Sequence, residues 1–345
     1  MNEEKQTEKR ISDPLKAVIA VALFFVCAAV FIGIIILPFE RVKMKDYDTL
    51  IIGSSETKWG MNAAVLKENT GCSVINLSSG PAAIPGRYEL LKGALRRYHP
   101  DTVVLDVCYD SFNAMQLPTW SSNNSIWIIP RMVSAESAWV YTTQLARIPW
   151  YDFGMIWGAA ADLSYDAWNH ILHGNYGIYQ EMAYSGYAEK TTDLFADEEE
   201  ISLRTRKAIY FEDRMSYNQA ALRDMLDLLS ETDVRVIMTT VPSSEMFSWY
   251  NPGVDRFWEE ITQMAEEYDV EYYDFNLYKG NADLFDDRTS FRDETHLNGE
   301  SAKVFSELFA REVLGKNREE VSIKDRFYTD YADYRNHSVY SIRPR

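Results

Sequence analysis

Basic residues are scarce in this chain. Its 345 residues include 35 Lys and Arg against 52 Asp and Glu, which gives a formal net charge of -17 at pH 7. A protein that binds nucleic acid needs a basic face for the phosphate backbone. The charge balance therefore predicts that nucleic acid is not a partner.

Cysteine and histidine are also few, with three and five residues. Cys72 and Cys108 adjoin predicted strands and are expected to be small buried side chains, with a disulfide between them left open. His170 and His173 are three residues apart, whereas helical zinc ligands are usually four apart and need a third ligand. We predict a structural or substrate-lining role for this pair, no metal and no cofactor.

Long apolar runs are absent except near the N-terminus. Segment 15–38 carries one charge, Lys16, and is otherwise apolar over about 20 residues, the length that crosses a bilayer as a helix. It ends without the small-residue pattern of a signal-peptide cleavage site, which favours a retained anchor over a cleaved leader or a buried core helix.

The orientation of this anchor is predicted from its flanks. Four basic residues, counting Lys16 at the start of the run, lie on its N-terminal side and three follow it, a weak positive-inside bias. We predict a single-pass protein of the cell membrane with a cytoplasmic tail, 1–14, an anchor in contact with membrane lipid, 15–38, and a domain outside the cytoplasm.

Apolar runs with strand character alternate with amphipathic segments beyond residue 40. Such alternation predicts a parallel sheet with helices on both faces. We expect an α/β fold over 40–315, a flavodoxin-like three-layer sandwich around a central parallel five-stranded sheet. The predicted strands are 46–52, 73–77, 102–107, 234–241 and 270–275. The predicted helices are 61–69, 87–98, 217–229, 254–268 and 298–313.

Two segments do not follow this alternation of strands and helices. Residues 113–215 are rich in Trp, Tyr, Asn and Ser, and we predict a mostly helical insertion over the carboxyl edge of the sheet, where loops shape substrate sites. Its aromatic side chains suit packing or sugar stacking. Residues 316–345 form a polar C-terminal tail that either packs on the domain or binds a partner.

Two short motifs stand at opposite ends of the predicted domain. Gly53-Ser54-Ser55 follows an apolar strand, and Asp293 lies three residues before His296, just before the last helix. A strand that ends in Gly-x-Ser places a hydroxyl at the carboxyl edge, and a serine needs a base because its own oxygen is a poor nucleophile at neutral pH. Taken singly, the first motif is a common turn and Asp293 suits a helix N-terminus.

In this order the motifs resemble the SGNH/GDSL hydrolase superfamily, and more closely its membrane-anchored bacterial branch associated with acyl transfer to cell-envelope polymers. The resemblance covers 46–112 and 217–313. It implies Ser55 as nucleophile, with Ser54 as the rival serine, His296 as general base and Asp293 as the carboxylate that orients it. It also implies an oxyanion hole from the backbone N–H groups of Ser55 and Gly80. The matching blocks are Gly53-Ser54-Ser55, Asn76-Leu77-Ser78-Ser79-Gly80 and Asp293-Glu294-Thr295-His296-Leu297-Asn298.

One block departs from the family. Its Gly-x-Asn-Asp pattern supplies an Asn that donates to the oxyanion, whereas this chain reads Asp106-Val107-Cys108-Tyr109-Asp110-Ser111. Tyr109 or Ser111 is then expected to substitute, with Asn76 and Ser54 as further accessory candidates. The departure mildly favours acyl transfer over plain hydrolysis.

The expected function is a serine-dependent O-acyl esterase or O-acyltransferase that acts on an extracytoplasmic cell-envelope polysaccharide through an acyl-enzyme on Ser55. Its partners would be a glycan or acyl ester substrate and a multi-pass membrane acyltransferase. The alternative is a catalytically degenerate glycan-binding or scaffold protein that works with such an acyltransferase. The sequence leaves the acyl group, the acceptor and the oligomeric state open.

Overall fold

The computed structural model describes residues 46–78, 84–113, 210–251, 253–315 and 323–337, and the helical positions 14–16, 18–24, 26–27 and 30. Most of the predicted tail 1–14 and of the predicted insertion 113–215 lies outside these residues, as do half of the predicted anchor 15–38 and the residues His170, His173 and Gly80. Within the described part of the chain, no helix is both long enough and apolar enough to cross a membrane.

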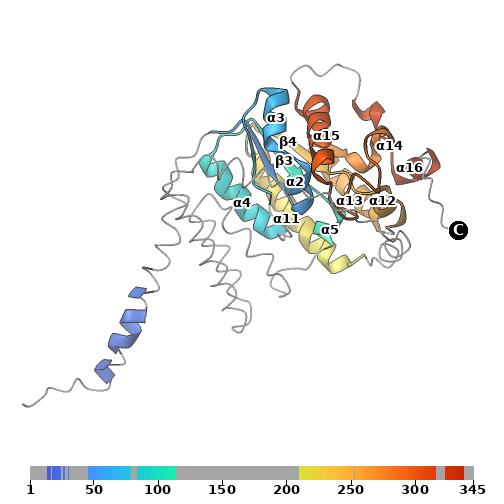
Figure 1. Ribbon diagram of the computed structural model, residues 1–345. Helices are drawn as coiled ribbons and strands as arrows, with labels where there is room; N and C mark the ends of the chain where they lie inside the picture. The colour runs from blue at the N-terminus through green and yellow to red at the C-terminus, as the bar shows by residue number, and fades with distance from the viewer. Residues whose placement is uncertain are drawn as a thin grey trace, which may run out of the picture.

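A five-stranded sheet forms the centre of the domain (Figure 1). Every pair of neighbouring strands is parallel, in the order β2-β1-β3-β4-β5, the order of doubly wound sheets of the flavodoxin type. The predicted α/β class is therefore confirmed. The strands are β1 (Thr49–Ile52), β2 (Val74–Asn76), β3 (Thr102–Asp106), β4 (Arg235–Thr240) and β5 (Glu271–Asp274).

The sheet is buried on both faces, as the apolar runs require. Successive side chains of a strand point to opposite faces. In β1, Leu50 and Ile52 therefore join one hydrophobic core while Ile51 joins the other, and β3 divides in the same way. The two cores explain why these strands read as continuous apolar runs rather than as alternating ones.

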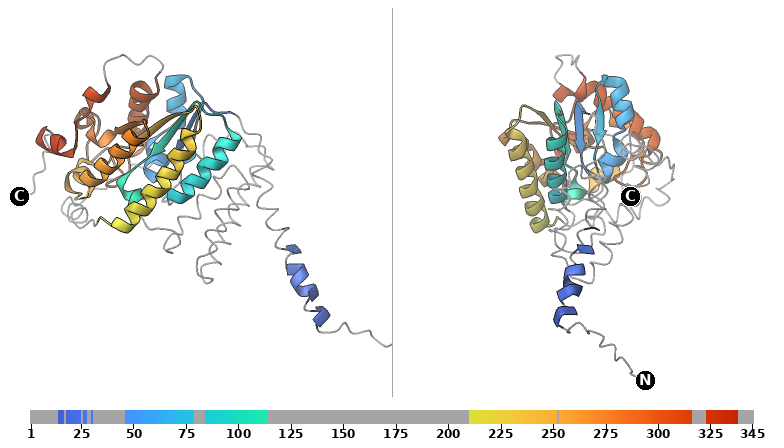
Figure 2. Two further views of the ribbon diagram at one scale, coloured as in Figure 1. Left: turned by 180° about the vertical axis from the view of Figure 1, so that it is seen from behind. Right: turned by 90° about the vertical axis from the view of Figure 1, so that its left-hand side faces the viewer.

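Three long helices cover one face: α4 (Ile84–Arg97), α11 (Glu212–Ser230) and α13 (Val254–Glu267). Figure 2 shows α4 and α11 lying next to each other on this side. Helix α11 begins inside the predicted insertion and earlier than the predicted 217–229, with the acidic residues Glu212 and Asp213 in its first turn. Acidic side chains at that end complement the helix dipole.

The opposite face is covered by α3 (Ala63–Thr70) and α15 (Gly299–Phe309) (Figure 2). Both helices begin with an Asn cap, whose side chain accepts backbone N–H bonds in the first turn. Helix α3 ends at Gly71, which has φ 74°, a left-handed conformation that favours glycine. A turn of π-helix, Ala310–Leu314, continues α15.

Short helices follow the carboxyl ends of the strands and were not predicted. Helix α2 (Ser55–Gly60) follows β1, α5 (Tyr109–Phe112) follows β3, α12 (Glu245–Tyr250) follows β4, and a 3₁₀ turn (Phe275–Leu277) follows β5. They gather side chains at one edge of the sheet, where open α/β sheets bind ligands. A further short helix, α14 (Asn281–Leu284), comes next in the chain.

The described part of the C-terminal tail packs on the domain. It contains a 3₁₀ turn (Ile323–Arg326) and α16 (Tyr331–His337). Tyr331 is buried, and its hydroxyl donates to Asp274 at 2.9 Å. Arg335 makes two hydrogen bonds to the Asp255 carboxylate, at 2.7 and 2.9 Å. The sequence left open whether the tail packs on the domain or binds a partner, and these residues pack on the domain.

Candidate active site

Ser55 is presented by a tight junction between β1 and α2. The buried Ser54 caps α2, and Ser55 is its first residue. A Cβ atom on Gly53 would lie 2.6 Å from Asp106 Cβ and 2.7 Å from Thr57 Oγ1. Only glycine therefore allows the ends of β1 and β3 to approach this closely, which fixes where the Ser55 hydroxyl emerges.

The structure brings Ser55, His296 and Asp293 into one hydrogen-bonded chain. Ser55 Oγ lies 2.7 Å from His296 Nε2, although 241 residues separate them in the sequence. His296 Nδ1 lies 2.5 Å from Asp293 Oδ1. A neutral imidazole with its proton on Nδ1 satisfies both contacts, since Nδ1–H donates to the carboxylate and Nε2 accepts from the serine. This is the arrangement in which histidine can take a proton from serine.

Asp293 is itself held in place by its own loop. Its Oδ1 accepts the backbone N–H of His296 at 2.9 Å and that of Thr295 at 3.1 Å, in addition to the imidazole. Burial pushes the pKa of Asp293 upward, but the hydrogen bonds and charge of His296 outweigh it, so its pKa is lowered. The carboxylate therefore remains ionised and aimed at the ring.

Carboxylates surround the imidazole. Burial acts to lower the pKa of His296, but the Asp293 hydrogen bond and the charges of Glu56 and Asp110 outweigh it and raise that pKa above its ordinary value. The Trp59 ring lies 5.3 Å from the imidazole and also contacts the guanidinium of Arg292. A more basic imidazole is a stronger proton acceptor, but it is neutral only at higher pH.

A buried carboxyl pair lies beneath the nucleophile. Ser54 Oγ is within hydrogen-bond distance of Glu56 Oε2 and, at 2.5 Å, of Asp106 Oδ2. One hydroxyl proton serves only one carboxylate, so one of the two carboxyl groups must carry a proton for both bonds to form. Burial raises the pKa of Asp106, which agrees with a proton held in this pair.

Arg87 and Cys108 complete this buried network. The Arg87 guanidinium donates to the Asp106 carbonyl at 3.2 Å and to Ser111 Oγ at 2.7 Å, and it lies 3.9 Å from Asp106 Oδ2. The Cys108 thiol lies 2.9 Å from Ser111 Oγ and 3.2 Å from Glu56 Oε2. The network joins α4, β3 and α5 to the start of α2, so it fixes the backbone that carries Ser55.

The accessory candidates have other partners. The amide of Asn76 donates to the carbonyls of Thr57 and Met61, at 3.2 and 2.9 Å, so it ties β2 to α2. Ser54 belongs to the carboxyl pair and Ser111 to Arg87. Tyr109 packs against aromatic rings. The nearest is that of Phe257, whose centroid lies 5.6 Å from the centroid of the Tyr109 ring. Of these, only Tyr109 lines the cavity beside the triad.

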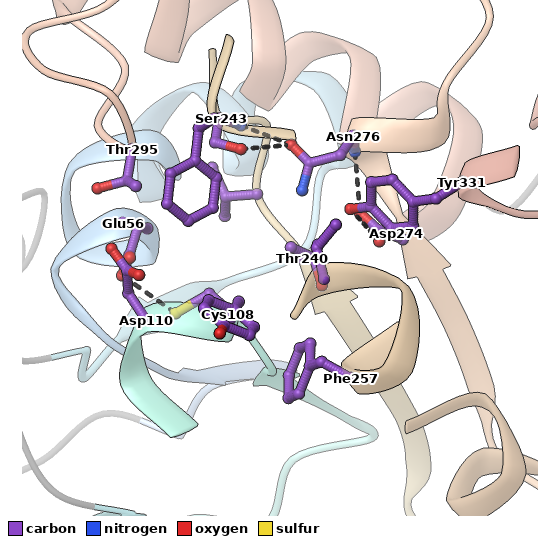
Figure 3. A pocket seen from close by; sticks show the side chains of 14 residues that line it. Glu56, Cys108, Asp110, Thr240, Ser243, Phe257, Asp274, Asn276, Thr295 and Tyr331 are labelled. Carbon is purple, nitrogen blue, oxygen red and sulfur yellow. Dashed lines mark hydrogen bonds between the residues drawn. The ribbon is translucent and has the colours of Figure 1, made fainter. Parts of the chain in front are cut away.

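That cavity opens beside Glu56 and Thr295, the residues that follow Ser55 and precede His296 (Figure 3). It runs from Glu56, Asp110 and Thr295 across the end of β4 to Asp274 and Tyr331. None of the three triad residues lines it, but two of their sequence neighbours do, and it lies at the carboxyl edge of the sheet, which makes it the candidate substrate pocket.

Metal binding at the buried network is disfavoured by its own chemistry. Ligand atoms of Glu56, Asp106 and Cys108 lie within 4.8 Å of one another. The Arg87 cation stands beside Asp106, however, and burial raises the pKa of the Cys108 thiol well above its usual value. A protonated thiol and a neighbouring guanidinium both oppose a cation there.

Sequence reasoning missed Glu56, Asp106, Arg87 and Trp59. Glu56 directly follows the serine motif, and Asp106 is a polar residue at the end of an apolar strand, so the sequence pointed to both as candidates. Nothing in the sequence pointed to Arg87, because its burial depends on three elements that meet only in the folded chain.

Comparisons with known proteins give this site no family. No protein-family model matches the chain, and no curated protein is significantly similar to it. What the site can do therefore follows from its own geometry.

Proposed function

We propose that this protein is a serine-dependent O-acyl esterase or O-acyltransferase of the SGNH/GDSL type. The observation that carries the proposal is the hydrogen-bonded chain from Ser55 through His296 to Asp293, with contacts of 2.7 and 2.5 Å. It stands at the carboxyl edge of a parallel sheet and beside a cavity. The strand order and the block order are further support for the SGNH assignment and its flavodoxin-like three-layer fold.

The acylation step begins with attack by Ser55 Oγ on the carbonyl carbon of an acyl ester. The serine proton passes to His296 Nε2 as the new C–O bond forms, and Asp293 stabilises the imidazolium. The imidazolium then gives this proton to the leaving alcohol oxygen as the original ester bond breaks. The products are a free alcohol and an acyl-enzyme on Ser55.

The developing oxyanion needs fixed donors. Ser55 is the first residue of α2, where a backbone N–H has no acceptor within its own helix. Gly80, the second donor in the proposal, lies outside the described residues. One such donor typically contributes about 10²–10³ in rate.

The second step decides between the two activities. An acceptor hydroxyl loses its proton to His296 as its oxygen attacks the acyl-enzyme, and the proton returns to Ser55 when the acyl group leaves. Water as acceptor gives an esterase, and a sugar hydroxyl gives an O-acyltransferase. With segment 15–38 as the anchor, the proposed substrate is an extracytoplasmic envelope polysaccharide, and a multi-pass membrane acyltransferase is the proposed donor partner.

The test is hydrolysis of p-nitrophenyl acetate by the full chain in mild detergent. We expect Ser55→Ala and His296→Ala to abolish the enzyme-dependent rate, and Ser230→Ala, which changes a serine at the end of α11, to leave it unchanged. A serine-reactive fluorophosphonate should label the peptide that contains Ser55. Equal rates in the wild type and in Ser55→Ala would refute the proposal.

One observation favours the second candidate, a degenerate scaffold or glycan-binding protein. The family Asn is missing after β3, and Ser111, one of its expected substitutes, is held by Arg87. The scaffold function predicts neither turnover nor fluorophosphonate labelling, so the same two assays separate the candidates.

A further inference from the structure

Ser55 and Trp59 lie on the same face of α2. They are four residues apart in this helix, and residues at that spacing are neighbours on a helix surface. The Ser55 hydroxyl contacts the His296 imidazole, and the Trp59 indole contacts the Arg292 guanidinium. Both contacts therefore join α2 to the loop that carries the proposed base.

His296 and Arg292 lie opposite each other across that loop. The Arg292 N–H donates to the His296 carbonyl at 2.7 Å, next to an antiparallel bridge between Phe291 and Leu297. Opposite residues of such a pair point to the same side, and successive residues alternate between sides. Phe291 and Leu297 enter the hydrophobic core. The side chains of His296 and Arg292 therefore point away from that core, and both meet α2.

The Trp59 ring contacts both of these side chains. Its centroid lies 5.3 Å from that of the imidazole, with an angle of 49° between the rings, a separation typical of favourable aromatic pairs. The Arg292 Cζ atom lies 3.8 Å from the centroid of the indole, which is a cation–π distance. The indole therefore packs against the imidazole and is itself held by the guanidinium.

Arg292 has no competing partner for its charge. Its side chain makes no ion pair and no hydrogen bond with any residue in the described ranges. Other arginines of the domain, such as Arg235 and Arg335, pair with carboxylates instead. The contact with Trp59 is therefore what fixes the position of the Arg292 guanidinium.

We propose that Trp59 and Arg292 are positioning residues that hold the His296 imidazole between Asp293 and Ser55, an inference that rests on the proposed acyl-ester chemistry. Asp293 and Ser55 contact only the two nitrogens at the edge of the ring, so neither stops the ring from swinging out of line. The indole blocks that motion on one side, and Arg292 keeps the indole in place. Misplacement of a catalytic group by about 1 Å can cost about 10² in rate, so this packing contact has a large effect on kcat.

The first experiment measures kcat and KM for p-nitrophenyl acetate with the full chain in mild detergent. We expect Trp59→Ala to lower kcat about 100-fold with KM nearly unchanged, because a positioning residue does not touch the substrate. Trp59→Phe keeps part of the contact, so its kcat should lie between those of the alanine variant and the wild type. Urea denaturation of each variant shows whether it is folded, and Trp59→Phe tests the proposal if the alanine variant is not.

Two arginine variants complete the first experiment. Arg292→Ala should lower kcat about threefold, the effect of a partly exposed cation–π contact. Arg288→Ala, which removes an exposed cation four residues earlier in the chain, is the matched control and should leave both constants unchanged.

A double variant tests whether Arg292 acts through Trp59. If it does, Trp59→Ala combined with Arg292→Ala should be no slower than Trp59→Ala alone, because the guanidinium then has no indole to hold. Losses that multiply, wild-type kcat in a folded Trp59 variant, or an equal loss in Arg292→Ala and Arg288→Ala would overturn the proposal.

The second experiment does not depend on turnover. NMR measures how fast the Nδ1–H proton of His296 exchanges with water, and the signal is identified by its loss in His296→Ala. We expect exchange about tenfold faster in Trp59→Ala, and an intermediate rate in Trp59→Phe, because a ring that loses an aromatic contact swings out and breaks its bond to Asp293 more often.

The two experiments separate the positioning role from the proposed function. A wild-type exchange rate in a folded Trp59 variant would refute the positioning role, whether or not the protein is an enzyme. Turnover of p-nitrophenyl acetate that persists unchanged in Ser55→Ala would instead refute the esterase function.

Discussion

The most informative perturbation is Asp293→Asn, because the loop fixes how the new amide must lie. Asp293 Oδ1 accepts from four donors, which are His296 Nδ1, the Thr295 hydroxyl and the backbone N–H groups of His296 and Thr295. In the asparagine variant the side-chain carbonyl oxygen must keep this position, since an NH₂ group there would face the same four donors. The imidazole then retains its proton on Nδ1, and only the charge is lost.

This geometry sets the expected size of the effect. A hydrogen bond to a charged group contributes about 1.5–3 kcal/mol, so Asp293→Asn should lower kcat/KM by roughly 10- to 100-fold. Asp293→Ala removes the orienting group entirely. In serine proteases, an imidazole held in the wrong tautomer costs roughly 10⁴ in kcat. The alanine variant here fixes neither the tautomer nor the orientation of the ring, so it should be far slower than the asparagine one.

The pH dependence gives a second readout. The Asp293 carboxylate helps to raise the pKa of His296, and the base must be neutral to act. Activity therefore rises with pH through this raised pKa, and Asp293→Asn should move the acid limb of kcat/KM to lower pH. The assay is p-nitrophenyl acetate hydrolysis from pH 5 to 9 (an interval of about two units on each side of neutral, around the histidine range). Equal rates for the Asn and Ala variants, or a limb that moves upward, would refute this reasoning.

Three further perturbations test the surroundings of the triad. Glu56→Gln removes another charge that raises the pKa of His296, so the acid limb should again move to lower pH in the same assay. Gly53→Ala forces a Cβ against Asp106 and should lower the free energy of unfolding by about 1–3 kcal/mol in urea denaturation. Arg87→Met leaves buried carboxyl groups without their cation and should lower that free energy by about 3 kcal/mol.

Each of these variants has a matched control. Glu300→Gln, at an exposed position of α15, should leave the pH profile unchanged, and Arg96→Met, at an exposed position of α4, should leave unfolding nearly unchanged. An unshifted acid limb in Glu56→Gln would show that Glu56 does not act on the imidazole. Wild-type stability in Gly53→Ala or Arg87→Met would show that the tight junction or the buried cation is not needed.

The fold was largely predictable because its signals are local. Each observed strand falls inside a predicted apolar run, since a strand buried on both faces has few polar residues. The short helices were missed because four to six residues carry no helical period. Helix α16 was missed for a different reason. Its stability comes from Tyr331 and Arg335, whose partners Asp274 and Asp255 lie far away in the sequence.

Part of the candidate site was likewise predictable from local sequence, and part was not. Ser55, His296 and Asp293 were predictable because each stands in a short motif at a strand end or before a helix. The buried network beneath them was not predictable, because its residues come from four different elements or junctions. These residues are Ser54, Glu56, Asp106 and Arg87. Asn76 lies in a block that resembles the family, yet its side-chain amide donates to the carbonyls of Thr57 and Met61, in and directly after α2. A motif gave the identity of these residues, but only the tertiary contacts show their partners.

The span of 241 residues between the serine and its base has a consequence for synthesis of the chain. A ribosome that has delivered the first four strands has made a hydroxyl with no proton acceptor and a cavity without Asp274 and Tyr331. If Ser55 is the nucleophile that we propose, the growing polypeptide cannot react with an ester until His296 has been added. Any product truncated before His296 lacks the proposed base and is expected to be inert toward esters, even if its earlier part folds.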